Sequence, residues 1–354
     1  MRKIVSRFFT SRCSFLSDSI LPFINEILNY SSLSIVGLEK NTGKTECLKY
    51  VLKRMPVDSR RIAVTSIGID GETVDQVTRT QKPEIVLPQG MFFATSEAHY
   101  RQRRLVSELV DVSDENTSLG RVVTAKALTS GKVLLSGPPS ATGLIRWMSQ
   151  MRRIGIDLTI VDGALSRLSS ASPAVSQSMI LATGAAYSAN VNTLVQKTAY
   201  VVQLINLPLA DDSMRSLFGT LDKGIWWLDD EGKLNELSSA TSLSQHIHFQ
   251  GMDRCRAIFV AGALVDGFIE KLRANRNLKN VEIVVRDFTR IFVSPQLFRL
   301  FIKAGGQISV LQKSKLIAIT VNPTSPTGFV LDSGALCEKL SEAVGLPVYD
   351  LLKN

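Results

Sequence analysis

Short apolar runs alternate with segments of helical spacing along most of the chain. The runs in the first part predict strands at 33–36, 62–66, 132–136, 156–161 and 200–205. Between the first two, apolar residues recur at i, i+3, i+4 and i+7 and end at a proline: Leu48, Val51, Leu52, Met55 and Pro56. Repeated strand–loop–helix units predict an α/β fold with a mostly parallel sheet and helices on both faces.

The same alternation continues into the second half of the chain. It predicts strands at 257–260, 281–285, 308–311 and 316–321, and helices at 264–274, 294–304 and 333–344. A long polar stretch precedes them and predicts a linker. We therefore expect four parts: a helical segment at 1–30, a first α/β domain at 31–228, a linker at 229–255 and a C-terminal α/β region at 256–354. The pattern leaves open whether the second half extends the first sheet or forms its own.

The composition of the chain indicates which kinds of partner it can bind. The chain has 354 residues, 45% hydrophobic and 21% charged, which is typical of a globular protein. Its net charge of +9 favours acidic partners such as nucleotides, but the charge is spread out and no aromatic-interleaved basic motif indicates nucleic-acid binding. No apolar run is long enough to predict a membrane span. The four cysteines include no Cys-x-x-Cys pair, so we expect no zinc or iron–sulfur site and a cytoplasmic location.

The stretch V-G-L-E-K-N-T-G-K-T-E-C at 36–47 carries the clearest chemistry. Phosphate-binding loops usually place four residues between the first glycine and Gly-Lys-Thr. Here five residues separate Gly37 from Gly43, and Leu38 stands where the first glycine is usual. The loop still lies between a predicted strand and an amphipathic helix, so we expect Lys44 to neutralise phosphate and the Thr45 hydroxyl to bind Mg²⁺.

Residues 31–228, which contain this loop, are therefore the expected nucleotide-binding domain of a phosphate-loop NTPase-like fold. We expect ATP to be the ligand, held by backbone amides and by the positive end of the helix that begins in the loop. The predicted nucleotide-binding residues are Gly37, Lys40, Asn41, Thr42, Gly43, Lys44, Thr45, Glu46 and Asn206.

The loop spacing resembles that of dethiobiotin synthetase and its relatives among the phosphate-loop ATPases. Many of these relatives carry an additional lysine five residues before the main one. Glu39 occupies that position here, and Lys40 lies one residue later, so Lys40 either reaches a phosphate or stays in solvent. The resemblance also implies a base-reading amide after a later strand, which would be Asn206.

Two acidic residues follow predicted strands. Asp70, in T-S-I-G-I-D-G-E, matches by resemblance the aspartate that binds magnesium or orients water, with Glu72 as a rival. Asp162, in L-T-I-V-D-G, ends the strand predicted there and is the second expected carboxylate on the magnesium side. Arg167 follows and either senses phosphate or pairs with a carboxylate. A plain Asp-Gly turn is the alternative for each aspartate. The expected catalytic residues are Lys44 and Asp70, and the expected metal-site residues are Thr45, Asp70 and Asp162.

A wider set of segments resembles one family. G-L-E-K-N-T-G-K-T, K-P-E-I-V-L-P-Q-G, V-D-G-A-L-S-R, A-G-A-L-V-D-G-F and V-N-P-T-S-P-T-G-F together are similar to the B subunit of the lysine 5,6-aminomutase reactivase of lysine fermentation. The resemblance covers about residues 30 to 350. It implies an ATP-driven factor that works with a companion MutS-like subunit and releases damaged cobalamin from lysine 5,6-aminomutase.

Two other functions stay open on the sequence alone. One is an ATP-dependent ligase similar to dethiobiotin synthetase, although the late part of the chain is longer than such a ligase needs. The other is a regulatory protein that binds a nucleotide without turning it over.

Overall fold

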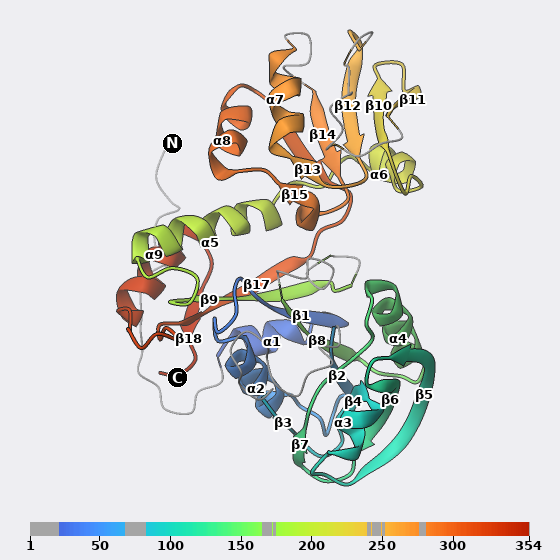
Figure 1. Ribbon diagram of the computed structural model, residues 1–354, viewed down its shortest axis with the longest axis vertical. Helices are drawn as coiled ribbons and strands as arrows, with labels where there is room; N and C mark the ends of the chain where they lie inside the picture. The colour runs from blue at the N-terminus through green and yellow to red at the C-terminus, as the bar shows by residue number, and fades with distance from the viewer. Residues whose placement is uncertain are drawn as a thin grey trace, which may run out of the picture.

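The computed structural model describes residues 21–67, 83–164, 172, 175–238, 242, 249, 252–275 and 281–353. The fold is α/β, with a large mixed sheet in one lobe and a smaller sheet in a second lobe (Figure 1). In spatial order, the strands of the main sheet are β18 (Val348–Asp350), β17 (Lys315–Asn322), β9 (Ser178–Gly184), β1 (Ser32–Gly37), β8 (Leu158–Ala164), β2 (Ile62–Ser66), β4 (Phe92–Ser96), β6 (Gly120–Ala127) and β5 (Ser107–Thr117).

The main sheet is mostly parallel, as expected. Every pairing from β18 through β4 is parallel, and only the pairings of β4 with β6 and of β6 with β5, at the far edge, are antiparallel. A short second ribbon, β3 (Ile85–Leu87) with β7 (Gly131–Val133), lies outside this sheet.

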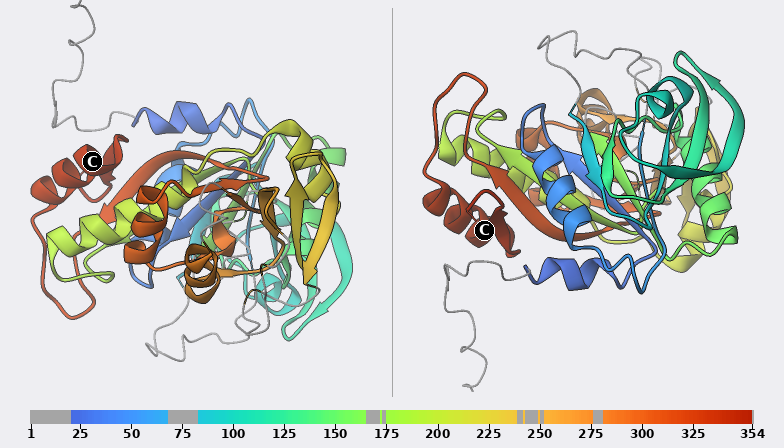
Figure 2. Two further views of the ribbon diagram at one scale, coloured as in Figure 1. Left: turned by 90° about the horizontal axis from the view of Figure 1, so that it is seen from above. Right: turned by 90° about the horizontal axis from the view of Figure 1, so that it is seen from below.

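Helices cover both faces of the main sheet, which confirms that prediction. Those of one face are α1 (Phe23–Ile27) and α2 (Lys44–Arg54), and those of the other are α4 (Ala141–Arg153), α5 (Val191–Ile205) and α9 (Ser333–Val344). In Figure 2, α5 lies in front of the sheet from above and α2 lies in front of it from below. Because both faces are covered, all six residues of β1 are buried: Ile35 packs with α2, and Val36 packs with α5.

The second lobe has its own sheet. Its strands, in spatial order, are β11 (Leu234–Ser238), β10 (Ile225–Asp229), β12 (Cys255–Val260), β14 (Glu282–Val285) and β16 (Gln307–Val310). Its helices and short elements are α6 (Asp212–Phe218), β13 (Leu264–Val265), α7 (Asp266–Ala274), a 3-10 turn (Phe288–Arg290), β15 (Ile291–Phe292) and α8 (Pro295–Lys303). One hydrophobic core runs from the α5 face of the main sheet into this lobe and contains Leu181, Leu194, Ile258 and Phe298. The two sheets therefore share buried apolar surface.

Two of the predicted elements are wrong. Residues 200–205 belong to α5 and not to a strand: Asn190 caps that helix by accepting from the Thr193 amide at 3.0 Å. The run Y-V-V-Q-L-I continues the buried helix face that begins at Leu194. The helical spacing of these apolar residues therefore determines the structure of the run, despite its content of β-branched residues. The strand expected at 132–136 is confined to Gly131–Val133 and pairs with β3 instead of joining the main sheet.

The predicted divisions of the chain also need correction. The expected linker at 229–255 contains β11, which pairs with β10, so this part of it is structured. The expected C-terminal region at 256–354 divides between the sheets, because β17, α9 and β18 return to the main sheet. Hydrogen bonding and burial along β17 place it beside β9. At the other end, residues 1–20 lie outside the described residues, and α1 is a short helix within the expected helical segment.

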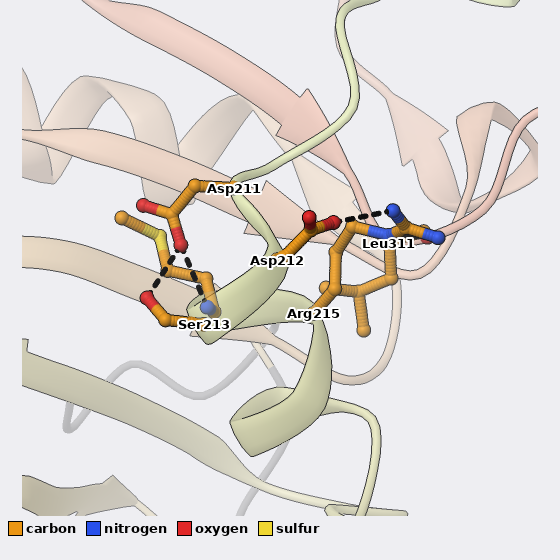
Figure 3. Close-up of polar contacts among 6 residues, drawn as sticks. Asp211, Asp212, Ser213, Arg215 and Leu311 are labelled. Atoms are coloured by element: carbon orange, nitrogen blue, oxygen red, sulfur yellow. Dashed lines mark hydrogen bonds and ion pairs between the residues drawn. The ribbon is translucent and has the colours of Figure 1, made fainter.

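A polar cluster begins α6 (Figure 3). The Asp211 carboxylate caps the helix: it accepts from the Ser213 hydroxyl at 2.6 Å and from the Met214 amide at 2.8 Å. These bonds, with Arg256 at 2.7 Å, lower the pKa of Asp211 below its usual value. Arg215 on the same helix donates to the Leu311 carbonyl at 3.3 Å, which ties α6 to the end of β16.

No helix in the described ranges is both long and apolar enough to span a bilayer.

Candidate functional site

The segment between β1 and α2 is a tight loop at the carboxyl end of β1. A Cβ added to Gly37 would lie 2.8 Å from Oγ1 of Thr42, so the loop folds back over this glycine. The Thr42 hydroxyl is buried and donates to the Glu39 carbonyl at 2.8 Å. Leu38 is buried in the core on the α5 face, and its amide donates to the Ala182 carbonyl at 2.9 Å. The unusual spacing is thus accommodated by a buried leucine and by the turn that follows it.

The second part of the loop has left-handed backbone. Asn41 has φ 62° and Gly43 has φ 89°, and Asn41 is the one described non-glycine residue with positive φ. Asn tolerates this region better than most residues. Its carbonyl accepts from Nδ2 of Asn322 at 2.9 Å, and Asn322 is the last residue of β17. A distant strand therefore holds the loop in its left-handed form.

Lys44 is the first residue of α2, and its ammonium lies 2.7 Å from Oδ1 of Asp162. Asp162 is in β8, parallel to β1 and opposite Ile35. Both side chains are mostly buried, with 26% of Lys44 and 21% of Asp162 exposed. The adjacency of β1 and β8 thus brings together the lysine and the carboxylate that the sequence singles out.

The start of α2 offers unused donors. Gly43 is its N-cap, and no side chain in the described part of the chain caps it. By contrast, Ser140, Asn190 and Asp332 cap α4, α5 and α9. The helices α7 and α8 also lack a side-chain cap. A missing cap therefore does not by itself indicate an anion site, and at α2 it does so only together with the ammonium of Lys44. Backbone N–H groups, a helix dipole and an ammonium at one place form an environment suited to an anion.

The remaining predicted loop residues differ in their surroundings. Thr45 is half-buried in the first turn of α2, next to Lys44. Lys40 is exposed on the loop. Glu46 forms an ion pair with Lys49 at 2.8 Å on the outer surface of α2, so its carboxylate is engaged on the helix. A ligand contact by Glu46 would therefore come from its backbone.

The expected metal site is described only in part. Asp70, Glu72 and Arg167 lie outside the described residues. Across the described ranges, no cluster of three or more His, Cys, Asp or Glu residues is placed to hold a metal ion. Mg²⁺ needs no such cluster, since it commonly takes one or two protein oxygens and completes its shell with water and phosphate. The Thr45 hydroxyl and the Asp162 carboxylate are oxygen donors of the required kind.

Asn206 does not have the position that was expected for it. It is the C-cap of α5 and not the end of a strand, and its carbonyl accepts from Nζ of Lys313 at 3.0 Å. The residue that ends a strand near the loop is Asn322, which the sequence analysis did not select. The signal for it was present in V-N-P-T, an apolar run that ends in Asn-Pro. Only the pairing of β17 with β9 shows that this run ends beside the loop.

The surface beneath the loop is apolar. Cys47, in the first turns of α2, is fully buried. Burial raises the pKa of its thiol to about 12; a hydrogen bond with Thr320 opposes the shift, and the Asp162 charge adds to it. The thiol therefore stays protonated and acts as a small apolar group in the core.

The loop G-P-P-S-A-T-G at 137–143 approaches the same edge of the sheet at β2. The Gly137 amide donates to Oγ of Ser66 at 3.3 Å, and a Cβ on Gly137 would lie 2.1 Å from the Ser66 carbonyl oxygen. The Ser140 hydroxyl accepts from the Gly143 amide at 3.0 Å, so this loop starts α4 with an ordinary N-cap.

Comparisons with protein-family models, curated proteins and solved structures found no match to this chain.

Proposed function

We propose that this chain binds ATP at the loop from Gly37 to Thr45 and hydrolyses it with the help of Mg²⁺. The observation that carries the proposal is the Lys44–Asp162 ion pair at the uncapped start of α2. A lysine beside helix amides without a side-chain cap attracts phosphate, and a carboxylate in the adjacent strand β8, two residues before its end, suits the metal side of such a site.

For ATP to bind at this loop, the triphosphate must displace Asp162 from the ammonium of Lys44. In the free protein, Lys44 neutralises Asp162 at 2.7 Å. A triphosphate carries more negative charge than one carboxylate and competes for the ammonium. Once Lys44 turns to phosphate, Asp162 loses its partner and can accept a hydrogen bond from water or approach the cation. Mg²⁺, when bound, neutralises the phosphate oxygens.

Asp70 is the proposed residue for orienting the attacking water. The resemblance to the dethiobiotin synthetase relatives gives it this role, and in the sequence it follows β2, the strand that pairs with β8. An ionised carboxylate near a cation keeps its charge and can hold a water by hydrogen bonding.

We further propose that hydrolysis drives work on another enzyme. The resemblance to the reactivase B subunit makes lysine 5,6-aminomutase the client, a MutS-like protein the companion subunit and the cytoplasm the location. The presence of a second lobe supports a client-binding role, because nucleotide binding at the β1–α2 loop uses the main sheet alone. Nucleotide binding can favour an open client only through a difference in affinity between the two states of the complex.

The test is ATP hydrolysis by the purified chain with Mg²⁺, alone and with the mutase and its companion. Stimulation by these proteins that is lost in Lys44→Ala and retained in Lys53→Ala, at an exposed lysine in the last turn of α2, supports the proposal. Turnover that needs a small carboxylate or amine instead would favour the ligase. Binding without turnover would favour a regulatory protein, and absence of nucleotide binding would refute the site.

A further inference from the structure

We propose that Asn322 is a positioning residue that holds the phosphate loop in its binding form. This inference rests on the proposed nucleotide site and names a residue of that site outside the loop. The contact that carries it is the hydrogen bond from Nδ2 of Asn322 to the carbonyl of Asn41, 2.9 Å long and formed between residues far apart in sequence.

The loop needs an external support at this point. It has one more residue than the usual spacing, and within it Asn41 has φ 62°. A non-glycine residue in this region is less stable than in the ordinary regions, so it persists where the surroundings fix it. The bond to the Asn41 carbonyl fixes the orientation of the peptide unit between Asn41 and Thr42, and hence the direction of an amide in the loop.

Asn322 is itself held firmly. Its backbone lies in the ladder with β9, opposite Gly184, and its carbonyl accepts from the Ala185 amide at 2.9 Å. A Cβ on Gly184 would lie 2.1 Å from the Asn322 carbonyl oxygen, so only glycine permits this approach. On the other side, Oδ1 of Asn322 accepts from the Thr324 amide at 3.1 Å. The side-chain amide is thereby oriented with its NH₂ group toward the loop.

The close approach of Asn322 gives a second reason for a glycine at position 43, in addition to its positive φ. A Cβ on Gly43 would lie 3.0 Å from Cβ of Asn322. The loop and the end of β17 are therefore packed against each other on both sides of Thr42. Truncation of Asn322 to alanine would remove the donor and keep the Cβ that contacts Gly43.

The first test is a double-mutant cycle on ATP affinity, measured by calorimetry. Asn322→Ala should weaken binding about fivefold, as expected for the loss of one hydrogen bond. Asn41→Gly should restore most of this loss in the double variant, because glycine adopts positive φ without support. Ser325→Ala, in the turn after Asn322, is the matched control and should leave the affinity unchanged. Equal losses in the single Asn322→Ala variant and the double variant would overturn the positioning role.

The second test does not depend on ATP binding. Hydrogen exchange of the loop amides at 38–43 in the full chain should be faster in Asn322→Ala than in the wild type, and unchanged in Ser325→Ala. If the wild type binds no ATP but the loop amides still exchange faster in Asn322→Ala than in the wild type, the proposed function fails while the positioning role stands. Unchanged loop exchange in Asn322→Ala would overturn the inference, whatever the affinity for ATP.

Discussion

Asp162→Asn should change nucleotide binding and nucleotide turnover in opposite directions. In the free protein, Asp162 competes with phosphate for the ammonium of Lys44. Asn has nearly the same shape and no charge, so the substitution frees Lys44 without leaving a cavity. ATP binding in the absence of Mg²⁺ should therefore become tighter. Turnover with Mg²⁺ should fall, because the carboxylate proposed for the metal side is lost.

The size of the gain follows from the geometry of the pair. Two unit charges about 4 Å apart attract each other by roughly 4 kcal/mol at an effective dielectric constant near 20. Desolvation and screening offset most of this attraction, and partly exposed pairs contribute about 1 kcal/mol or less. Both side chains here are about one-quarter exposed, at 26% and 21%, so the upper part of that range applies. Release of Lys44 should thus tighten metal-free binding by about fivefold.

The assay is calorimetric titration with ATP and a chelator at several salt concentrations. The difference between Asp162→Asn and the wild type should shrink as salt screens the pair. Asp212→Asn is the matched control: its carboxylate also pairs with a cation, Arg215 at 2.9 Å, but its side chain is 95% exposed in the second lobe. Weaker metal-free binding in Asp162→Asn would show that the ion pair organises the site, and the competition argument would then be wrong.

Three further outcomes are expected. Lys44→Ala should weaken ATP binding by about 10- to 100-fold, the effect of one charge-assisted hydrogen bond. Lys53→Ala, at the exposed end of α2, should change ATP binding little; calorimetry compares the two variants. Asp211→Asn should lower the melting temperature at neutral pH. Because the folded pKa of Asp211 is lowered, the difference should shrink as the pH falls below about 4 and be lost once the pH passes the folded pKa; a difference that stays constant into strong acid would contradict this. Cys47 should resist alkylation in the native protein at mildly alkaline pH, because its thiol is buried with a pKa of about 12, and it should react on unfolding. Mass spectrometry of the modified peptide measures the labelling, and rapid labelling of the native protein would contradict the burial.

The part of the α/β framework around the loop is local in origin and was predictable, whereas five strands of the main sheet were not predicted: β4, β5, β6, β9 and β18. β1, the loop and α2 follow one another directly, and the apolar spacing of α2 is readable without any distant contact. The later strands β12, β14, β16 and β17 were also predicted, because each is a short apolar run bounded by polar residues. Failures occurred where one run fits two periods, as at 200–205, and where a polar stretch still pairs, as in β11.

The candidate site divides in the same way. The sequence by itself determined the chemical groups: the amides of a glycine turn, Lys44, Thr45 and an aspartate after an apolar run. Tertiary structure decided which of them meet. Asp162 reaches Lys44 because β8 pairs with β1, and Asn322 reaches Asn41 because β17 returns from the second lobe to pair with β9. Strand order depends on the burial of whole faces across distant segments, so no local spacing records it.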